Sequence, residues 1–364
     1  MILYLAYASL LFLGIQLINT LLNFIFIQRL RNGAPTTSER ISILIPARNE
    51  EDNIPFLLAD LSKCSNPNLE IVVFDDESTD GTANVVENFA KVDNRIRLIR
   101  SNGLPVGWLG KNHACHRLAQ NASGNYLLFL DADVRIDESV IADAVVYLKK
   151  NNLKLLTVFP TQLMMTFGER ISVPIMNYIL LSLLPLIFVR ISPFASHAAA
   201  NGQFMLFDAD IYKKIKPHQL FKNNPVEDIA IARYFKKQKL KLACITGEKR
   251  IKCRMYKTYN DAVNGFSKNV FMFFGNIPIL ACFFWAFSFL GFIPVIISLP
   301  QYLTYYLVTQ ALVIILYSFV SKQNILYNIV LFPFHLCFLT IIIGKALYIR
   351  KNKKLKWKER VIYS

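Results

Sequence analysis

The sequence lacks the short motifs that most often hold a metal ion or a nucleotide. Its six cysteines show no C-x-x-C spacing and two of them lie in apolar segments, which argues against a zinc site and against a disulfide framework. Neither G-x-G-x-x-G nor G-x-x-x-x-G-K-[ST] occurs in the first half of the chain. A dinucleotide fingerprint and a P-loop are therefore absent there, and a bound phosphate must be held in another way.

Charge is missing from a long segment at the start of the chain. Residues Ile2 to Ile27 contain no charged side chain, which exceeds the roughly 20 residues that cross a bilayer, and Arg29 and Arg31 follow at once. We expect a transmembrane anchor over residues 1–28 with its carboxyl end in the cytoplasm. A cleaved signal peptide would have a basic start and a shorter apolar core.

A second region poor in charge, residues 277–349, is interrupted by Pro294, Pro300 and a polar patch at 321–324. Hydropathy predicts three crossings there. A basic tail (350–364) on the same side as the central domain requires an even number. Either one segment is re-entrant or interfacial, or the tail breaks the rule. We expect a multi-pass protein of the cell (inner) membrane whose central domain is cytoplasmic.

The net charge of +16 does not indicate nucleic acid. The basic excess lies largely in the tail and in short runs such as "ARYFKKQKLK", and the sequence has no recognisable nucleic-acid-binding motif. We therefore expect anionic lipid headgroups as the partner, at about 1 kcal/mol per basic residue near the surface.

The middle of the chain, residues 40–276, alternates short β-branched runs with helical segments. Strands are predicted at "ISILIPA", "EIVVFDD", "IRLIR" and "NYLLFLDAD", and helices begin near Asn53, Gly81 and Lys111. This order predicts an α/β domain built from βαβ units, with helices on both faces of a sheet. Ligands bind at the carboxyl ends of strands in such sheets, where residues 46–50, 75–76 and 131–133 fall.

Two aspartates follow the last of these predicted strands. Asp131 and Asp133 are two residues apart, so both carboxylates can point to one side. Mg²⁺ is typically held by one or two carboxylates together with phosphate oxygens and water. The alternative is a turn in which the aspartates bond their own backbone.

A second acidic pair, Asp75 and Asp76, ends an earlier strand. The following turn supplies helix caps, which leaves Asp76 free to accept hydrogen bonds from a nucleobase or ribose. In "IPARNEE", Glu50 is positioned to face a base and Arg48 to meet phosphate. Lys111, beside the glycine turn "PVGWLG", is a further phosphate candidate, against the alternative of a solvated lysine.

Glu227 and Asp228 open a helix, where acidic residues favour the helix dipole by roughly 0.3–1 kcal/mol. The functional alternative is a general base that takes a proton from an acceptor hydroxyl. We assign that role to Asp228, with Glu227 positioning it or contacting the acceptor.

The apolar segment 171–196 is broken by prolines and carries Arg190, which favours an interfacial helix pair over a clean span, with buried core as the alternative. Gly202 and Gln203 follow it and are predicted to line an acceptor pocket.

Seven segments, in order, resemble family 2 glycosyltransferases of the GT-A fold: "ILIPARNEE", "VVFDDESTDGT", "GWLGKNHAC", "LFLDADV", "NGQFMLF", "VEDIAIA" and "RMY". The resemblance extends from about Ile41 to Tyr256. Several of these segments and the tail motif "WKER" look most like the membrane-bound branch that glycosylates carotenoid acids and related hydrophobic lipids.

The resemblance implies a mixed GT-A sheet and a UDP- or GDP-sugar donor. It implies Mg²⁺ or Mn²⁺ at Asp131 and Asp133, and Asp228 as the base of an inverting single displacement onto a hydrophobic lipid acceptor such as a carotenoid or hopanoid. The residues that it implies around the nucleotide are Pro46, Ala47, Glu50, Asp76 and Lys111.

One departure concerns the Q-x-x-R-W motif of polymer-forming relatives. Here the region reads "EKRIKCRMYKT" without tryptophan, which argues against processive synthesis. Arg254 either replaces that arginine and meets phosphate or is a solvent-facing strand cation. Two other functions stay open: transfer to polyprenyl phosphate, and a non-catalytic scaffold that binds nucleotide sugar. The presence of Asp131, Asp133 and Asp228 argues against the scaffold.

Overall fold

The computed structural model describes residues 1–31, 39–352, 355–357 and 360–362. Residues 32–38, between the predicted anchor and the middle of the chain, and part of the basic tail lie outside these residues. The chain forms two compact units, which we call the sheet unit (Gln28–Thr161 and Leu186–Arg254) and the helical unit (Met1–Ile27, Gln162–Pro185 and Met255–Ser364). Each is described by itself.

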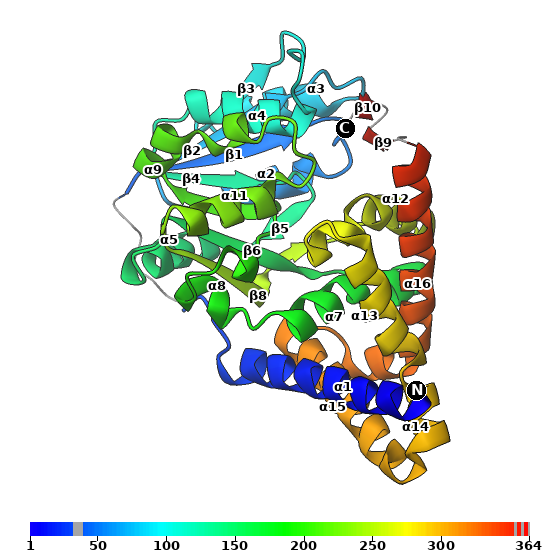
Figure 1. Cartoon of the computed structure of the whole chain (residues 1–364). Helices are drawn as coiled ribbons and strands as arrows, with labels where there is room; N and C mark the ends of the chain where they lie inside the picture. Colours follow the sequence, from blue (N-terminus) through cyan, green and yellow to red (C-terminus); the bar gives the residue numbers. More distant parts are fainter. Residues whose placement is uncertain (32–38, 353–354, 358–359, 363–364) are drawn as a thin grey trace. The chain divides into compact units, whose positions relative to one another are not determined.

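The sheet unit alternates strands and helices, as the sequence predicts (Figure 1). Its elements are β1 (Ile41–Ala47), α2 (Ile54–Ser62), β2 (Leu69–Asp75), α3 (Thr82–Val92), β3 (Ile96–Arg100), α4 (Gly110–Gln120), β4 (Tyr126–Leu130), β5 (Val134–Ile136), α5 (Val140–Lys150), β6 (Leu155–Gln162), α8 (Ile187–Ile191), η1 (Ala195–His197), β7 (Phe204–Asp208), α9 (Ala209–Ile215), α10 (Pro217–Leu220), α11 (Glu227–Lys237) and β8 (Leu242–Cys253).

The described strands of this unit form one eight-stranded sheet in the order β3-β2-β1-β4-β7-β6-β8-β5. The first four strands in that order are parallel, β7 is antiparallel to β4 and β6, and β5 is antiparallel to β8. The predicted mixed sheet is confirmed. Because β2, β1 and β4 are parallel neighbours, the loops that follow them meet at one edge.

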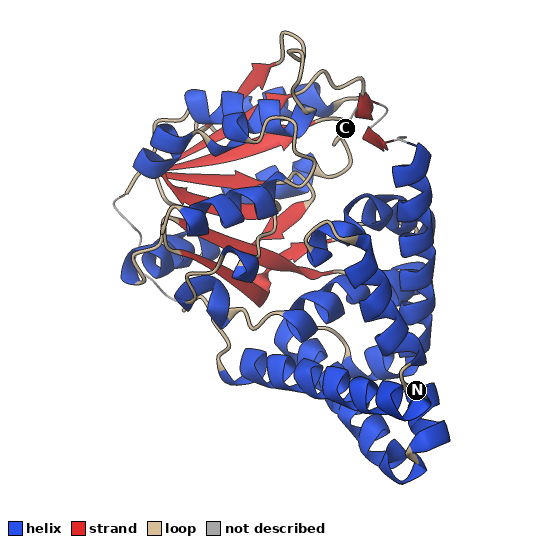
Figure 2. Ribbon diagram, viewed as in Figure 1, coloured by secondary structure: helices blue, strands red, loops and turns tan. Residues whose placement is uncertain are grey.

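Helices cover both faces of the sheet (Figure 2). Alternate β1 residues Ile41, Ile43 and Ile45 are fully buried in a core shared with α2 and α5. On the other face Phe129 and Phe207 lie against Tyr212 of α9, with ring centroids 5.4 and 5.1 Å away. Burial on both faces is why these strands read as continuous apolar runs.

An ion pair holds β5, the strand that follows Asp133. Asp60 of α2 is buried, and its carboxylate accepts hydrogen bonds from Arg135 Nε at 2.5 Å and Nη2 at 2.7 Å. The same carboxylate accepts the Ile136 N–H at 3.3 Å. Paired donors from one guanidinium fix direction as well as distance, so Asp60 sets the position of the short strand.

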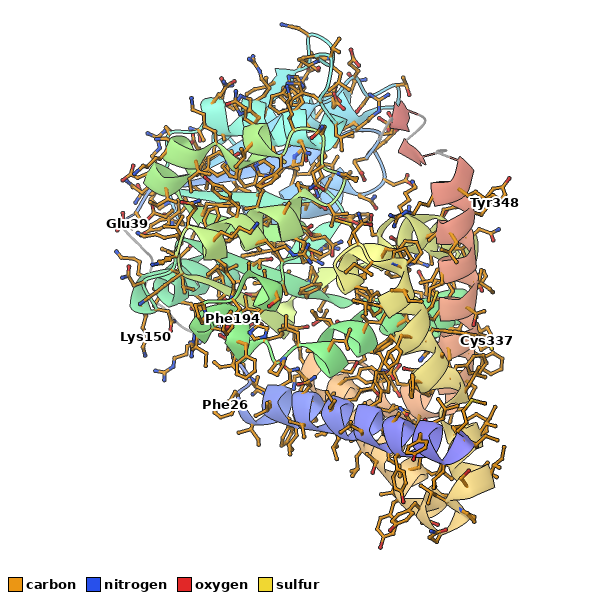
Figure 3. The ribbon with its side chains drawn as sticks, in the orientation of Figure 1. Phe26, Glu39, Lys150, Phe194, Cys337 and Tyr348 are labelled. Carbon is orange, nitrogen blue, oxygen red and sulfur yellow. The ribbon has the colours of Figure 1, made fainter. Side chains whose placement is uncertain are left out.

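The helical unit consists of apolar helices and a short hairpin at its end. Its elements are α1 (Ile2–Ile25), α6 (Phe167–Ser172), α7 (Pro174–Leu183), α12 (Tyr259–Asn269), η2 (Val270–Phe274), α13 (Pro278–Leu290), α14 (Phe292–Ser298), η3 (Pro300–Tyr302), α15 (Leu303–Ser321), α16 (Ile325–Asn352), β9 (Leu355–Trp357) and β10 (Arg360–Ile362). In α16, Cys337 and Tyr348 are both exposed (Figure 3).

Buried polar side chains join the apolar helices of this unit. Gln16 of α1 donates to the Tyr178 hydroxyl of α7 at 2.9 Å, and that hydroxyl donates to Ser288 of α13 at 3.0 Å. Asn23 donates to the carbonyls of Leu181 and Leu184 at 2.9 Å. Satisfied polar contacts of this kind fix the rotation of helices whose surfaces are otherwise uniformly apolar.

In the described residues, three helices are long and apolar enough to cross a membrane: Ile2–Ile25, Pro300–Ser321 and Ile325–Lys351. The pair Tyr259–Phe274 and Pro278–Leu290 reaches the same apolar length only together and is bent by 100°. The predicted anchor over residues 1–28 therefore corresponds to α1. Of the three crossings that hydropathy predicts after residue 277, two are single long helices.

The unit boundaries differ from the domain boundaries predicted from sequence. Residues 162–185, which include the first part (171–185) of the predicted interfacial segment 171–196, belong to the helical unit, where Tyr178 is fully buried. The second part, with α8, belongs to the sheet unit, and its Phe194 is 65% exposed. The apolar pattern reports burial but does not tell a protein interior from a bilayer.

We expect Asp60→Asn to lower the free energy of unfolding by about 1–3 kcal/mol, because the change weakens charge-assisted hydrogen bonds to a largely buried group. Thermal unfolding in detergent measures the effect. Glu87→Gln is the matched control: its ion pair with Arg100 is as short, at 2.6 Å, but exposed, and should be worth less than about 1 kcal/mol. Equal losses in the two variants would contradict the structural role of Asp60.

Candidate active site

The loops after β1 and β2 are bonded to each other. Asn49 N–H donates to Ser78 Oγ at 3.0 Å, Thr79 N–H donates to Asn49 Oδ1 at 2.9 Å, and Glu50 N–H donates to Thr82 Oγ1 at 2.8 Å. Asn49 has a φ of 53°, a left-handed conformation that asparagine tolerates better than most residues. The two loops thus form one fixed wall at the sheet edge.

A buried aspartate and an arginine lie in this wall. Asp76 is 2% exposed, and its N–H donates to the Ala47 carbonyl at 2.8 Å. Arg48 Nη1 donates to the Asp76 carbonyl at 2.5 Å and lies 4.0 Å from its carboxylate. Two predicted nucleotide-binding residues are therefore in direct contact, and Pro46 and Ala47 end the strand that carries them.

A lysine and two carboxylates meet beside the end of β4. Lys111 Nζ of α4 lies 2.7 Å from Asp131 Oδ1 and 3.8 Å from Glu227 Oε1. Burial by itself lowers the pKa of Lys111, but the Asp131 and Glu227 carboxylates outweigh it and raise that pKa above its ordinary value. The ammonium group therefore stays charged throughout the physiological pH range.

Asp133 is held on one side only. Its Oδ2 accepts a hydrogen bond from the Cys253 thiol at 3.3 Å, while its buried Oδ1 has no partner among the described residues. Burial, and next the charge of Asp131, raises the pKa of Asp133 to about 7. Burial also raises the pKa of the Cys253 thiol well above its ordinary value, so the sulfur carries the proton that it donates.

The Asp131 and Asp133 pair fits a hard divalent cation. The described residues contain no cluster of three or more histidine, cysteine or acidic side chains that would enclose a metal ion. Two carboxylates with one unpartnered oxygen are suited to Mg²⁺ or Mn²⁺ when phosphate oxygens and water supply the remaining ligands.

Glu227 and Asp228 begin α11 and face the same space. A β-carbon at Gly202 would lie 3.1 Å from Lys111 Nζ, 3.5 Å from Glu227 Oε1 and 3.7 Å from Asp228 Oδ2. Asp228 Oδ2 accepts the Gly202 N–H at 3.0 Å. Charged groups from α4 and α11 therefore converge on Gly202, where a side chain would press against the Lys111 ammonium group.

Burial perturbs both acids of this pair. It raises the pKa of Asp228, and it raises the pKa of Glu227 to about 7. The charge of Lys111 lowers the Glu227 pKa, and the charge of Asp228 raises it. A carboxylate with a raised pKa is a stronger base than one in water. The arrangement can therefore accept a proton at neutral pH.

The segment Asn201–Gln203 connects the acidic groups. The Gln203 carbonyl accepts the Asp131 N–H at 3.3 Å, and its amide Nε2 donates to Cys253 Sγ at 2.8 Å. Asn201 is fixed by Thr157, whose hydroxyl donates to the Asn201 carbonyl and accepts the Asn201 N–H, both at 2.9 Å. Gly202 and Gln203, predicted to line an acceptor pocket, also support the acidic groups.

Asn112 fixes the loop before α11. Its side-chain amide donates to the carbonyls of Phe221 at 2.8 Å and Asn224 at 3.0 Å. The Leu109 N–H donates to the Lys222 carbonyl at 2.8 Å. The helix that carries Lys111 is thereby tied to the loop that leads into Glu227 and Asp228.

The predicted residues fall into two groups along one sheet edge. The first group, in the β1 and β2 loops, comprises Pro46, Ala47, Arg48, Glu50 and Asp76; the second comprises Lys111, Asp131, Asp133, Gly202, Gln203, Glu227 and Asp228. Arg254 follows β8, one residue beyond the Val134–Cys253 pair and thus next to the strand that leaves Asp133.

Sequence reasoning missed three supporting residues: Asn112, Asn201 and Cys253. Asn112 and Asn201 lie within the segments "GKNHAC" and "NGQFMLF", which offered a signal. Cys253 offered none, because its partner Asp133 is 120 residues away.

Residues 42–214 match the family model described as "Glycosyl transferase family 2". The 4,4'-diaponeurosporenoate glycosyltransferase of Staphylococcus haemolyticus is 26% identical over 64% of this chain and 62% of its own length. The protein of the same name from Staphylococcus aureus (strain MRSA252) is 27% identical over 63% of this chain and 60% of its own length. The matches thus span about three fifths of these relatives.

The mannosyltransferase PcManGT of Pyrobaculum calidifontis, solved in complex with GDP-Man and Mn²⁺, is similar in structure, with a TM-score of 0.59. The two chains are 16% identical, and the match covers 96% of this chain and 99% of the other. This likeness shows that the fold is of the GT-A type. Over residues 42–214 the chain is therefore similar to glycosyltransferase family 2.

The raised pKa of Glu227 predicts how stability changes with pH. Between the unfolded value of roughly 4.3 and the folded value of about 7, the folded protein holds a proton that the unfolded chain has released. Stability therefore falls as pH rises through this window and is lowest above it.

We expect Glu227→Gln to remove part of the fall in stability that accompanies rising pH. The melting temperature of the variant should rise relative to wild type between pH 5 and pH 8, by about 2–4 °C for each kcal/mol, in thermal unfolding followed in detergent. The exposed Glu138→Gln is the control and should leave the pH profile unchanged. Parallel profiles for wild type and Glu227→Gln would contradict the assignment.

Proposed function

We propose that the protein is a membrane-bound, inverting glycosyltransferase that moves one sugar from a nucleotide-sugar donor to a hydrophobic lipid acceptor. The observation that carries the proposal is the meeting of Lys111, Glu227 and Asp228 at Gly202, with Asp131 bonded to the same lysine. A cation and several carboxylates beside the carboxyl end of a strand suit an anionic, activated donor. The family match and the names of the relatives support the reaction class.

The donor binds along the sheet edge in this proposal. Arg48, Glu50 and Asp76, with Pro46 and Ala47, form the nucleotide end of the site in this proposal, where the buried Asp76 carboxylate accepts hydrogen bonds from a base or ribose. Lys111 lies toward the diphosphate, where its positive charge stabilises the negative charge that develops on the leaving group. A UDP- or GDP-sugar fits, and the neighbour solved with GDP-Man supports this donor class.

Asp131 and Asp133 hold Mg²⁺ or Mn²⁺ in this proposal. When bound, the ion neutralises charge on the departing diphosphate. The fit rests on the unpartnered Asp133 Oδ1, and the Mn²⁺ of the structural neighbour supports it. Arg254, which follows the β8 residue paired with Val134, is assigned to phosphate.

Asp228 acts as the general base. The acceptor oxygen forms a bond to the anomeric carbon from the face opposite the diphosphate, the bond from that carbon to the diphosphate oxygen breaks, and the acceptor proton passes to Asp228. Gly202 N–H holds one oxygen of this carboxylate. Glu227, whose Oε1 lies 3.8 Å from Lys111 Nζ, orients the acceptor beside Gly202.

The acceptor is a hydrophobic carboxylic acid or alcohol, and the relatives' name favours a carotenoid acid. A carboxylic acid is already ionised at neutral pH, so Asp228 then orients the acceptor more than it deprotonates it. Gly202 and Gln203 are assigned to the acceptor end of the site.

The helical unit anchors the enzyme in the cell membrane, with α1, α15 and α16 as spans. Two crossings after the catalytic domain return the basic tail to the side of that domain, which satisfies the bias of Lys and Arg toward the cytoplasm. The catalytic domain is then cytoplasmic, and the tail adds attraction to anionic lipid.

We expect Asp228→Asn to lower kcat by roughly 10²–10⁴ with an acceptor alcohol, and by less with an acceptor carboxylate, because only the alcohol needs its proton removed. The assay uses purified protein in detergent with Mn²⁺, UDP-glucose or GDP-mannose, and either a carotenoid acid or the corresponding alcohol, with product measured by mass spectrometry.

The control is Asp210→Asn, an exposed acidic residue of α9. A product formed on polyprenyl phosphate alone would move the acceptor assignment to that lipid. If wild type forms no more product than Asp228→Asn and Asp133→Ala, the non-catalytic scaffold is supported instead.

A further inference from the structure

Cys253 carries a fully buried thiol that contacts Gln203 and Asp133 of the candidate site. Its sulfur accepts a hydrogen bond from Gln203 Nε2 at 2.8 Å and donates to Asp133 Oδ2 at 3.3 Å. The register of β5 and β8 pairs Cys253 with Val134, the residue after Asp133, so the thiol reaches the carboxylate across a strand pair.

The contact fixes how Asp133 presents its two oxygens. Because the Gln203 amide donates to the sulfur, the thiol hydrogen is left to point at Asp133 Oδ2. Oδ1 is buried and has no partner among the described residues. The thiol thus holds Oδ2, while Oδ1 is left for a ligand.

We propose that Cys253 is a positioning residue that holds Asp133 so that its second oxygen is presented to a divalent cation bound with a nucleoside diphosphate. The inference rests on the proposed function and deepens it. Groups that hydrogen-bond a metal-ligating carboxylate orient it, and their loss typically weakens metal binding 10- to 100-fold.

A thiol is an unusual choice for this position. It is a weak donor, so it orients the carboxylate without competing strongly for its charge. The same Gln203 that holds the sulfur accepts the Asp131 N–H with its carbonyl. Gln203 therefore links the two aspartates, one through its backbone and the other through Cys253.

The chain offers a matched control on the same strand. Cys244 of β8 is also fully buried, and the structure gives its thiol no hydrogen bond to any described residue. Cys244→Ala removes a buried sulfur from β8 as Cys253→Ala does, but leaves Asp133 untouched. A difference between the two variants therefore reports the contact and not the loss of core volume.

The test is a Mn²⁺ titration of the full-length protein in detergent, followed by electron paramagnetic resonance, with UDP in one arm and GDP in the other. We expect Cys253→Ala to weaken the Kd for Mn²⁺ by about 10-fold or more, Cys253→Ser to restore most of the affinity, and Cys244→Ala to stay within about 2-fold of wild type. Thermal unfolding of each variant accompanies the titration.

Three outcomes would overturn the proposal. If wild type binds Mn²⁺ and Cys253→Ala binds it equally well, or no worse than Cys244→Ala, the positioning role is wrong while the proposed function stands. If the serine variant is as weak as the alanine variant, the cysteine acts by packing and not by its hydrogen bond. If wild type binds no Mn²⁺ with either nucleotide, the metal assignment fails and the inference with it.

Discussion

The site depends on one short segment, Asn201–Gln203, that bonds directly to two of its aspartates and reaches a third through one cysteine. The Gly202 N–H holds Asp228, the Gln203 carbonyl holds the backbone of Asp131, and the Gln203 amide reaches Asp133 through a cysteine. Thr157 fixes the segment at its start. Residues that are more than a hundred positions apart in sequence are therefore held by three consecutive ones, and the absence of a side chain at Gly202 leaves the space that they share.

This arrangement concentrates negative charge at partly buried positions. Asp131, Asp133, Glu227 and Asp228 lie around one half-buried lysine, Lys111, and burial raises the pKa of three of these acids. Such a cluster costs stability, because the folded state must keep carboxylates together that the unfolded chain would release into water. Sites of this kind are retained for chemistry, since a buried cluster interacts strongly with a cation and an anionic ligand that arrive together.

The sequence predicted the strands and the site edge well for a physical reason. Strands buried on both faces are continuous apolar runs, and β1 was located to the residue; the acidic motifs follow β2 and β4 directly. Contacts across the sheet were not predictable. Cys253 contacts Asp133 only because β8 pairs with β5. Residues 162–185 belong to the helical unit, where Tyr178 is buried among apolar helices, and hydropathy does not distinguish a protein interior from lipid.

The proposed function requires that the acids at this sheet edge receive a sugar diphosphate and its cation together. An experimental structure with Mn²⁺ and an intact donor analogue tests this directly. We expect Mn²⁺ between the diphosphate and the carboxylates of Asp131 and Asp133, the base beside Asp76, and Asp228 on the face of the anomeric carbon opposite the diphosphate. A donor bound elsewhere, or a cation that contacts neither aspartate, would contradict it.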